Sequence, residues 1–184
     1  NTNGNWFYNN EYFSIDVGTN SHPAFADLSG DGLLDLLVGA GNGYVYYYKN
    51  TGAKETPSFT LQPGRDTTEF DAMIDILGNA INVGFDAAPT FIDLDKDGDF
   101  DLVIGSAFEG LFYYKNVGSA SDHKFERQIT KEENPFFSIH KAPYPTNHVK
   151  SDGTRSTVGE YLKPNFYDFD DDGLKMRRCD ASHL

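Results

Sequence analysis

The sequence predicts an all-β protein built from tandem four-stranded antiparallel blades of propeller type, in an incomplete ring of about two and a half repeats. Three observations predict this fold. A long segment of the chain recurs at one constant offset. Apolar and polar residues alternate in short runs bounded by Gly, Asn, Pro and Asp, which is typical of strands. Signals for helices are nearly absent.

The repeat is visible when position 17 of the chain is placed on position 83, a shift that we call one repeat length. This shift places 17–18 (Val-Gly) on 83–84 and 47–50 (Tyr-Tyr-Lys-Asn) on 113–116, with identical Pro, Phe, Asp and Gly residues between them. A second, slightly longer shift places 158–173 on the same template, where a third copy begins and then runs out. The number of identities at a constant offset excludes a chance match.

We therefore divide the chain into three repeats and an extension. Residues 1–12 form an N-terminal extension, which is either a strand donated to a neighbouring chain or a frayed tail. The first repeat spans 13–66, the second 67–133, and a partial third 134–184. Residues 140–157, rich in Pro, Thr, Ser, His and Lys, form a surface insertion in the third copy.

Each repeat is expected to contain four strands in a fixed order. The first two strands flank an acidic loop, the third is rich in aromatic residues, and the fourth is a short run. In the first repeat the strands cover, in order, 22–28, 34–40, 44–50 and 58–62, with counterparts one repeat length later. The Tyr side chains of the third strand either pack between blades or stack on sugar rings, and neighbouring Tyr residues point to opposite faces.

The candidate metal-ligating residues of each repeat lie in a nine-residue acidic loop, 27–35 in the first repeat and 93–101 in the second. Oxygen-bearing side chains stand at positions 1, 3, 5 and 9, with a Gly at position 6 for a sharp turn. Together with a backbone carbonyl at position 7, this spacing surrounds one Ca²⁺ with hard oxygen ligands. Without a cation, the clustered carboxylates would repel one another.

Other interpretations of the loops are weaker or remain open. An EF-hand needs a bidentate Glu at position 12, where this chain has Val38 and Ile104. Mg²⁺ prefers fewer protein ligands and retained water. The remaining alternative is a solvated Asp-Gly turn that binds no ion, above all in the first loop, where Ser29 replaces a carboxylate.

The third copy of the loop is incomplete. It contains Asp168, Asp170, Asp172 and Gly173, but position 9 is Met176, which offers no hard oxygen. We therefore expect a weak or empty third site, to be completed by water or by a neighbouring chain.

The segments 23–40 and 89–106, each followed by Tyr-Tyr-Lys-Asn-x-Gly, resemble the FG-GAP or VCBS-type repeat, the calcium-loop blade of integrin α-subunit propellers. The resemblance implies a structural Ca²⁺ in each hairpin. It assigns ten ligands: Asp27, Ser29, Asp31, the Leu33 carbonyl and Asp35 in the first loop, then Asp93, Asp95, Asp97, the Asp99 carbonyl and Asp101 in the second.

Two features depart from this family pattern. After Gly173 the pattern calls for an Asp and an apolar strand, whereas the chain continues with basic residues between 175 and 178. Closed propellers usually have four to eight blades, and this chain has fewer than three. Either the chain is a fragment of a longer propeller, or identical chains complete one another through open strand edges and form an oligomer or filament.

Composition excludes several classes of function. Fifteen Lys and Arg against 28 Asp and Glu give a formal charge of −13, so neither nucleic acid nor an anionic membrane is an expected partner. No apolar run approaches the roughly 20 residues of a membrane helix. The five His, the single Cys and the Ser residues form no catalytic motif, so we do not expect an enzyme.

The sequence thus predicts a calcium-stabilised structural or adhesive repeat module of an extracellular or cell-surface protein. Its expected partners are copies of itself or other propeller blades. The alternative is a lectin-like module that binds glycans through the Tyr-rich strands or the insertion at 140–157.

Overall fold

The computed structural model describes residues 15–62, 64, 72–107, 109–137, 163–168 and 175–177. The predicted N-terminal extension, the insertion at 140–157, and the candidate ligands Asp170 and Asp172 lie outside this described part of the chain.

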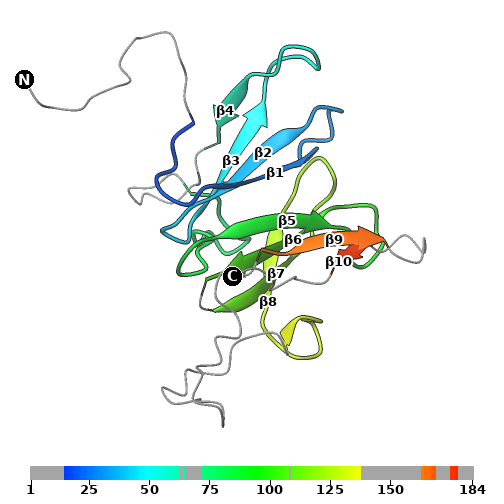
Figure 1. The fold of residues 1–184 in the computed structure, drawn as a ribbon. Coiled ribbons are helices and arrows are strands. Elements are labelled where there is room, and N and C mark those ends of the chain that lie inside the picture. The colour runs from blue at the N-terminus through cyan, green and yellow to red at the C-terminus, as the bar shows by residue number, and fades with distance from the viewer. Residues whose placement is uncertain are drawn as a thin grey trace, which may run out of the picture.

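Two four-stranded antiparallel sheets form the described part, followed by a two-stranded one (Figure 1). The first sheet, blade 1, has the order β1 (His22–Ala26), β2 (Asp35–Gly39), β3 (Val45–Asn50) and β4 (Phe59–Leu61). The second sheet, blade 2, has the order β5 (Ala88–Ile92), β6 (Asp101–Ser106), β7 (Gly110–Asn116) and β8 (Phe125–Gln128). Strands β9 (Asn165–Asp168) and β10 (Lys175–Arg177) pair antiparallel. The predicted all-β fold of tandem four-stranded blades is confirmed.

The strands of both blades lie close to their predicted bounds, and register repeats with the sequence. Phe25 lies opposite Leu36, and its counterpart in the second repeat, Phe91, lies opposite Leu102. Strand β1 ends at Ala26 and not at position 28, because the carboxylate of Asp27 accepts hydrogen bonds from the loop backbone instead of leaving Asp27 in the ladder. Local turn chemistry therefore sets the strand ends.

The two blades pack face to face around one apolar core, which we call the inter-blade core. Both blades supply side chains to it, and the segment between them adds Met73, Ile81 and Val83. Its largest members from the strands are Leu37, Val45 and Tyr47 of blade 1, and Leu102, Ile104, Phe112, Tyr114 and Phe125 of blade 2. All of these are at most 7% exposed.

Alternation along β3 divides its tyrosines between two faces, as the period of a strand requires. Tyr47 belongs to the inter-blade core, whereas Tyr46 and Tyr48 belong to a separate cluster on the opposite face of blade 1. All three are at most 8% exposed. Of the two interpretations of this strand, packing is therefore the one that the geometry supports.

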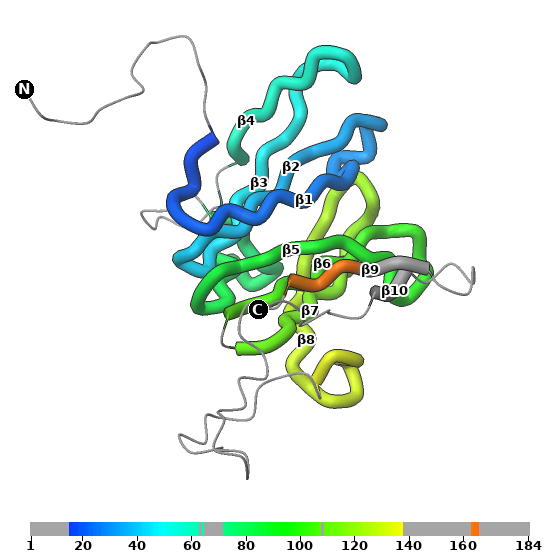
Figure 2. Tube along the Cα trace, in the orientation of Figure 1, coloured from blue at the N-terminus to red at the C-terminus, as the bar shows by residue number. Residues whose placement is uncertain are grey.

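The first strands of successive repeats lie side by side, β1 beside β5 and β5 beside β9 (Figure 2). The described residues close no ring. No helix among the described residues is long and apolar enough to cross a membrane.

Backbone from both repeats meets closely where blade 1 joins blade 2. The N–H of Ala87 donates to the carbonyl of Ala40 at 3.0 Å, and the N–H of Val83 donates to that of Gly43 at 2.9 Å. A β-carbon at Gly39 would collide with the carbonyl oxygen of Ala87. Glycine is therefore required at position 39 for space.

We expect Gly39→Ala to lower the free energy of unfolding by about 1–3 kcal/mol, because the added methyl group overpacks the blade junction. Lys54→Ala, at an exposed turn, is the matched control and should change stability by less than about 0.5 kcal/mol. Chemical denaturation of both variants measures the difference. Equal stability of the two variants would show that the junction relaxes to accept the methyl group.

Alkaline pH should destabilise the fold through its buried tyrosines. Burial raises the pKa of Tyr114 from 10.0 to about 12. Because the folded pKa exceeds the unfolded value, this contribution to stability is complete below pH 10 and is lost as pH rises toward 12. We expect the free energy of unfolding to fall across this window, and less steeply in Tyr114→Phe. Tyrosinate absorbance that titrates fully near the unfolded pKa in the folded protein would contradict this assignment.

Candidate metal centre

The two acidic loops occupy equivalent places, between β1 and β2 and between β5 and β6. In the first loop the Asp27 carboxylate accepts hydrogen bonds from the N–H groups of Asp31 and Gly32, at 3.2 and 2.8 Å. Asp93 does the same for Asp97 and Gly98 in the second loop, at 3.2 and 3.1 Å. Position 1 therefore folds each loop back on itself.

Glycine at position 6 has a conformational reason. Gly32 and Gly98 adopt φ angles of +82° and +94°, in the left-handed region that side chains disfavour. The turn they allow brings the carboxylates at positions 1, 3 and 5 of the second loop to the same side. The predicted role of this glycine in the loop turn is thus confirmed.

The second loop gathers three carboxylates into one cluster. One oxygen each from Asp93, Asp95 and Asp97 lies within 4.8 Å of the others. Asp95 and Asp97 are exposed and Asp93 is partly buried, so the cluster faces solvent. Three convergent carboxylates at the surface form a site that can hold a metal ion such as Ca²⁺.

Lys115 supplies the counter-charge of this cluster. Its ammonium group pairs with the Asp95 carboxylate, and this hydrogen bond holds the pKa of Asp95 below its usual value. The same bond raises the pKa of Lys115. Both side chains are about one third exposed, so the pair is weak and an ion can displace the lysine.

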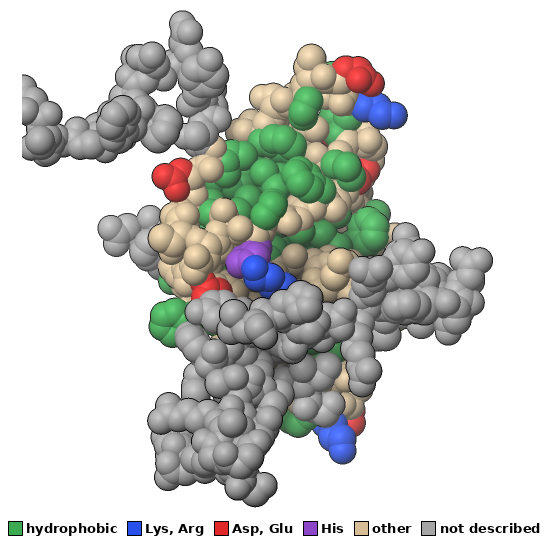
Figure 3. Space-filling model, in the orientation of Figure 1, with side chains coloured by type: hydrophobic (Ala, Val, Ile, Leu, Met, Phe, Trp, Pro, Cys, Tyr) green, Lys and Arg blue, Asp and Glu red, His purple; other side chains and the backbone are tan. Residues whose placement is uncertain are grey.

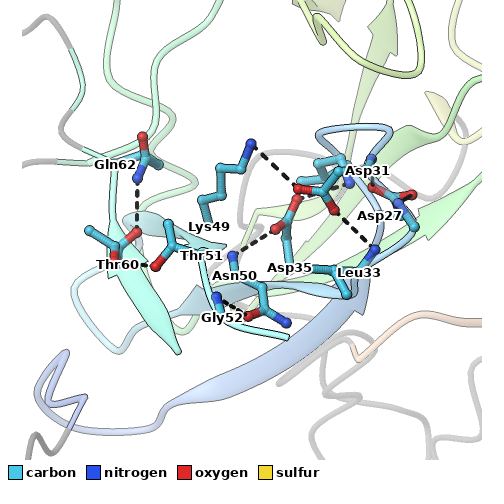
Figure 4. Close-up of polar contacts among 12 residues, drawn as sticks. Asp27, Asp31, Leu33, Asp35, Lys49, Asn50, Thr51, Gly52, Thr60 and Gln62 are labelled. Atoms are coloured by element: carbon cyan, nitrogen blue, oxygen red, sulfur yellow. Dashed lines mark hydrogen bonds and ion pairs between the residues drawn. The ribbon is translucent and has the colours of Figure 1, made fainter. Parts of the chain in front are cut away.

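The first loop differs because Ser29 stands at position 3. Lys49, the counterpart of Lys115, pairs instead with Asp31 at position 5, at 3.6 Å (Figure 4). The N–H of Leu33 is the main cause of the lowered pKa of Asp31, with contributions from Ser29 and Lys49. The Ser29 hydroxyl oxygen is buried and makes no hydrogen bond of standard geometry.

The carboxylates at position 9 occupy a different environment. Asp35 and Asp101 are both 0% exposed. Asp101 accepts hydrogen bonds from the Leu94 N–H at 3.2 Å, the Tyr113 hydroxyl at 2.8 Å and the Asn116 N–H at 2.8 Å. Burial raises the pKa of Asp101, and these hydrogen bonds oppose the rise.

Asp35 makes the same three contacts in the first repeat. It accepts from the Leu28 N–H at 3.1 Å, the Tyr47 hydroxyl at 3.0 Å and the Asn50 N–H at 2.8 Å. Figure 4 shows its contact with Asn50 beside the pair of Lys49 and Asp31. Position 9 thus fastens the loop to the third strand, and its role as a ligand stays a prediction.

Sequence analysis did not single out the residues that hold position 9. These are the Tyr and Asn of the repeated Tyr-Tyr-Lys-Asn motif, namely Tyr47, Asn50, Tyr113 and Asn116. They follow the acidic loop at the same sequence separation in both repeats, and this regularity is the signal from which they could have been predicted. Burial and the neighbouring carboxylate raise the pKa of both tyrosines.

The remaining predicted ligands are only partly placed. Leu33 and Asp99, the predicted carbonyl ligands, donate their N–H groups to Asp31 and Asp97, at 3.0 Å in each case. Asp168 ends β9. The contacts of a bound ion with any of these residues stay predictions.

We expect Asp101→Asn to lower the free energy of unfolding by about 1–3 kcal/mol, measured in chelator so that metal plays no part. The side-chain amide of Asn accepts hydrogen bonds at its oxygen but not at its nitrogen, so at least one buried donor loses its partner. Asp99→Asn, in the same loop, is the control and should be nearly neutral. Equal effects of the two substitutions would refute the structural role of position 9.

Comparison with known proteins agrees with this geometry. No solved structure matches the chain significantly. The model of the FG-GAP repeat family matches residues 19–53, which contain β1, β2, β3 and the complete first acidic loop. This match confirms, for that segment, the resemblance to the FG-GAP repeat found in the sequence.

Proposed function

We propose that this chain is a calcium-stabilised structural module of an extracellular or cell-surface protein, and that it packs side by side with other repeats of its kind. One observation carries the proposal. The Asp93, Asp95 and Asp97 carboxylates converge within 4.8 Å, at the position equivalent to the acidic loop inside the FG-GAP segment.

The proposed role of the ion is mechanical. Each loop connects the first two strands of a blade, and its position 9 is bonded to the third strand. An ion held by the exposed carboxylates would remove their mutual repulsion and fix the loop against both strands. Millimolar extracellular calcium is enough to fill sites of the affinity typical of extracellular modules.

A non-catalytic role agrees with the family, whose repeats are generally structural modules. The acidic cluster found among the described residues lies in a loop. Its carboxylates accept hydrogen bonds from the loop backbone and pair with a lysine. These contacts support an ion site that stabilises the fold.

An apolar cluster on the outer face of blade 1 supports packing against further repeats, because Phe25 beside it is 54% exposed although the cluster's own members are buried. This outer face is formed by Leu36, Val38, Ala40, Tyr46 and Tyr48, with Val17, Tyr44, Phe59 and Leu61 packed against them. The counterparts of these residues in the second repeat include Leu102, Ile104, Phe112, Tyr114 and Phe125, which blade 1 covers inside this molecule.

Exposure differs between these two equivalent faces. Phe25, beside Phe59 on the outer face at 6.3 Å between ring centroids, is 54% exposed, whereas its counterpart Phe91 is partly buried and packs against the inter-blade core. Apolar side chains gather over the strands of blade 1 in Figure 3. Another blade-like face, from a second copy or from a neighbouring repeat, is the partner of matching chemistry.

We expect millimolar Ca²⁺ to raise the melting temperature relative to chelator, because an ion that binds only the folded state stabilises it by mass action. Asp97→Asn should make this calcium-induced rise smaller, because it removes most of the contribution of the second loop. Glu55→Gln, an exposed acid outside both loops, should keep the full shift. Scanning calorimetry measures these melting temperatures. A wild-type melting temperature that is the same in Ca²⁺ and in chelator would refute the proposal.

Assembly should depend on the outer face of blade 1. We expect the wild-type chain to form species larger than a monomer in light scattering, and Phe25→Asp to shift the distribution toward monomer. Leu77→Asp is the control, because Leu77 is 79% exposed but lies in the turn between the two blades. A monomeric wild type at high concentration, or equal effects of both substitutions, would count against self-assembly.

A further inference from the structure

Among the described residues, the first acidic loop has a close neighbour in the blade that follows it. The turn between β7 and β8 of blade 2 packs against the first loop. Gly30 of that loop approaches this turn so closely that a β-carbon on it would lie 2.8 Å from the Ser121 β-carbon. The corresponding position in the second loop is Lys96, so the second loop does not share this requirement for glycine.

His123, in the same turn, bonds the first loop directly. Its Nδ1 lies 3.0 Å from the carbonyl oxygen of Leu28. Because a carbonyl oxygen can only accept, Nδ1 must carry the proton and donate it. Leu28 follows Asp27, the position 1 residue of the loop, so this hydrogen bond fixes the backbone from which the first predicted ligand projects.

The imidazole ring of His123 also reaches the carboxylate at position 9 through one intermediate side chain. It packs edge-on against Tyr47, with ring centroids 5.1 Å apart and an interplanar angle of 90°. The Tyr47 hydroxyl donates to Asp35 at 3.0 Å. One side chain of blade 2 therefore contacts both ends of the first loop, at Leu28 directly and at Asp35 through Tyr47.

The histidine is not a constant feature of this turn in the repeat. The equivalent position in the first repeat is occupied by Pro57, which has no side-chain donor. The position is therefore not a general requirement of the blade. The turn that contains His123 is braced by Asn116, whose side-chain oxygen accepts from the Gly118 and Lys124 N–H groups at 3.0 and 2.9 Å, so the imidazole is presented from a fixed backbone.

Space for an ion and its water remains beside this contact. A cavity of about 200 Å³ lies between the two loops, and Asp27, Gly98, Phe100 and His123 are among the residues that line it. Since a water molecule occupies about 30 Å³, the cavity can hold water ligands next to Asp27. The turn therefore supports the first loop without filling the space around it.

We propose that His123 is a positioning residue for calcium in the first loop, so that blade 2 sets the ion affinity of blade 1. This inference rests on the proposed calcium-binding function. Because Ser29 provides only a hydroxyl at position 3, the first loop has one carboxylate fewer than the second. A backbone held in place from outside lowers the ordering cost of binding an ion.

The test isolates each loop and then changes His123. Asp97→Asn disables the second loop, and Asp31→Asn disables the first. In the Asp97→Asn background, His123→Phe keeps an aromatic ring but no donor, and His123→Asn keeps a side-chain N–H near the position of Nδ1. Lys124→Ala changes the neighbouring exposed side chain and is the matched control.

Calcium titration by calorimetry gives the result. We expect His123→Phe to raise the Kd of the first loop about three- to tenfold, the range that the loss of one hydrogen bond implies. His123→Asn and Lys124→Ala should stay within about twofold of the parent. In the Asp31→Asn background, no change at position 123 should alter the Kd of the second loop.

Three outcomes would overturn the inference. An unchanged first-loop affinity in His123→Phe would show that the hydrogen bond does not position the ion site. Equal weakening of both loops would show a general loss of stability instead of local positioning. An absence of calcium binding in the wild-type chain would refute the proposed function as well, which separates that failure from the first two.

Discussion

The buried carboxylate at position 9 of each acidic loop is the contact on which the rest of the hairpin depends. Asp35 and Asp101 have no exposed surface, yet each accepts two backbone N–H groups and a tyrosine hydroxyl. These donors come from the start of the loop, the middle of the third strand and its end. Each would cost about 1–3 kcal/mol if buried without a partner. Loop and strand therefore hold their relative positions through one side chain.

This constraint separates the carboxylates of a loop into two groups. The one at position 9 is stabilised by hydrogen bonds inside the fold, whereas the others, at positions 1 and 5 in both loops and also at position 3 in the second, lie near the surface and repel one another. Lys49 and Lys115 offset part of that repulsion, but a partly exposed lysine gives little energy. The remaining negative charge makes the triad of the second loop a site that can hold a divalent cation.

Strand positions and loop turns could be predicted because both arise from local sequence. The alternation in β2 and β3 and the glycines at Gly32 and Gly98 act over a short stretch of chain, and the repeat supplied every local signal twice. The burial of Asp35 and Asp101 was less accessible, because a pattern of Asp residues does not show which one faces the core. The contact of His123 could not be predicted from the sequence, because its partner Leu28 is 95 residues away in the chain. The first repeat also has Pro57 at the equivalent position, so the repeat gave no signal for it.

The comparison of the two loops shows why a repeat cannot be understood from one copy. Both loops share the turn, the glycine and the bonds of position 9, so these properties belong to the repeat. The contacts of Gly30 and His123 exist only because blade 2 follows blade 1. In this pair of blades, the first loop thus takes its carboxylates from its own sequence and its support from the next blade. Differences between repeats at turn positions, such as Pro57 against His123, are therefore where the properties of individual blades should be sought.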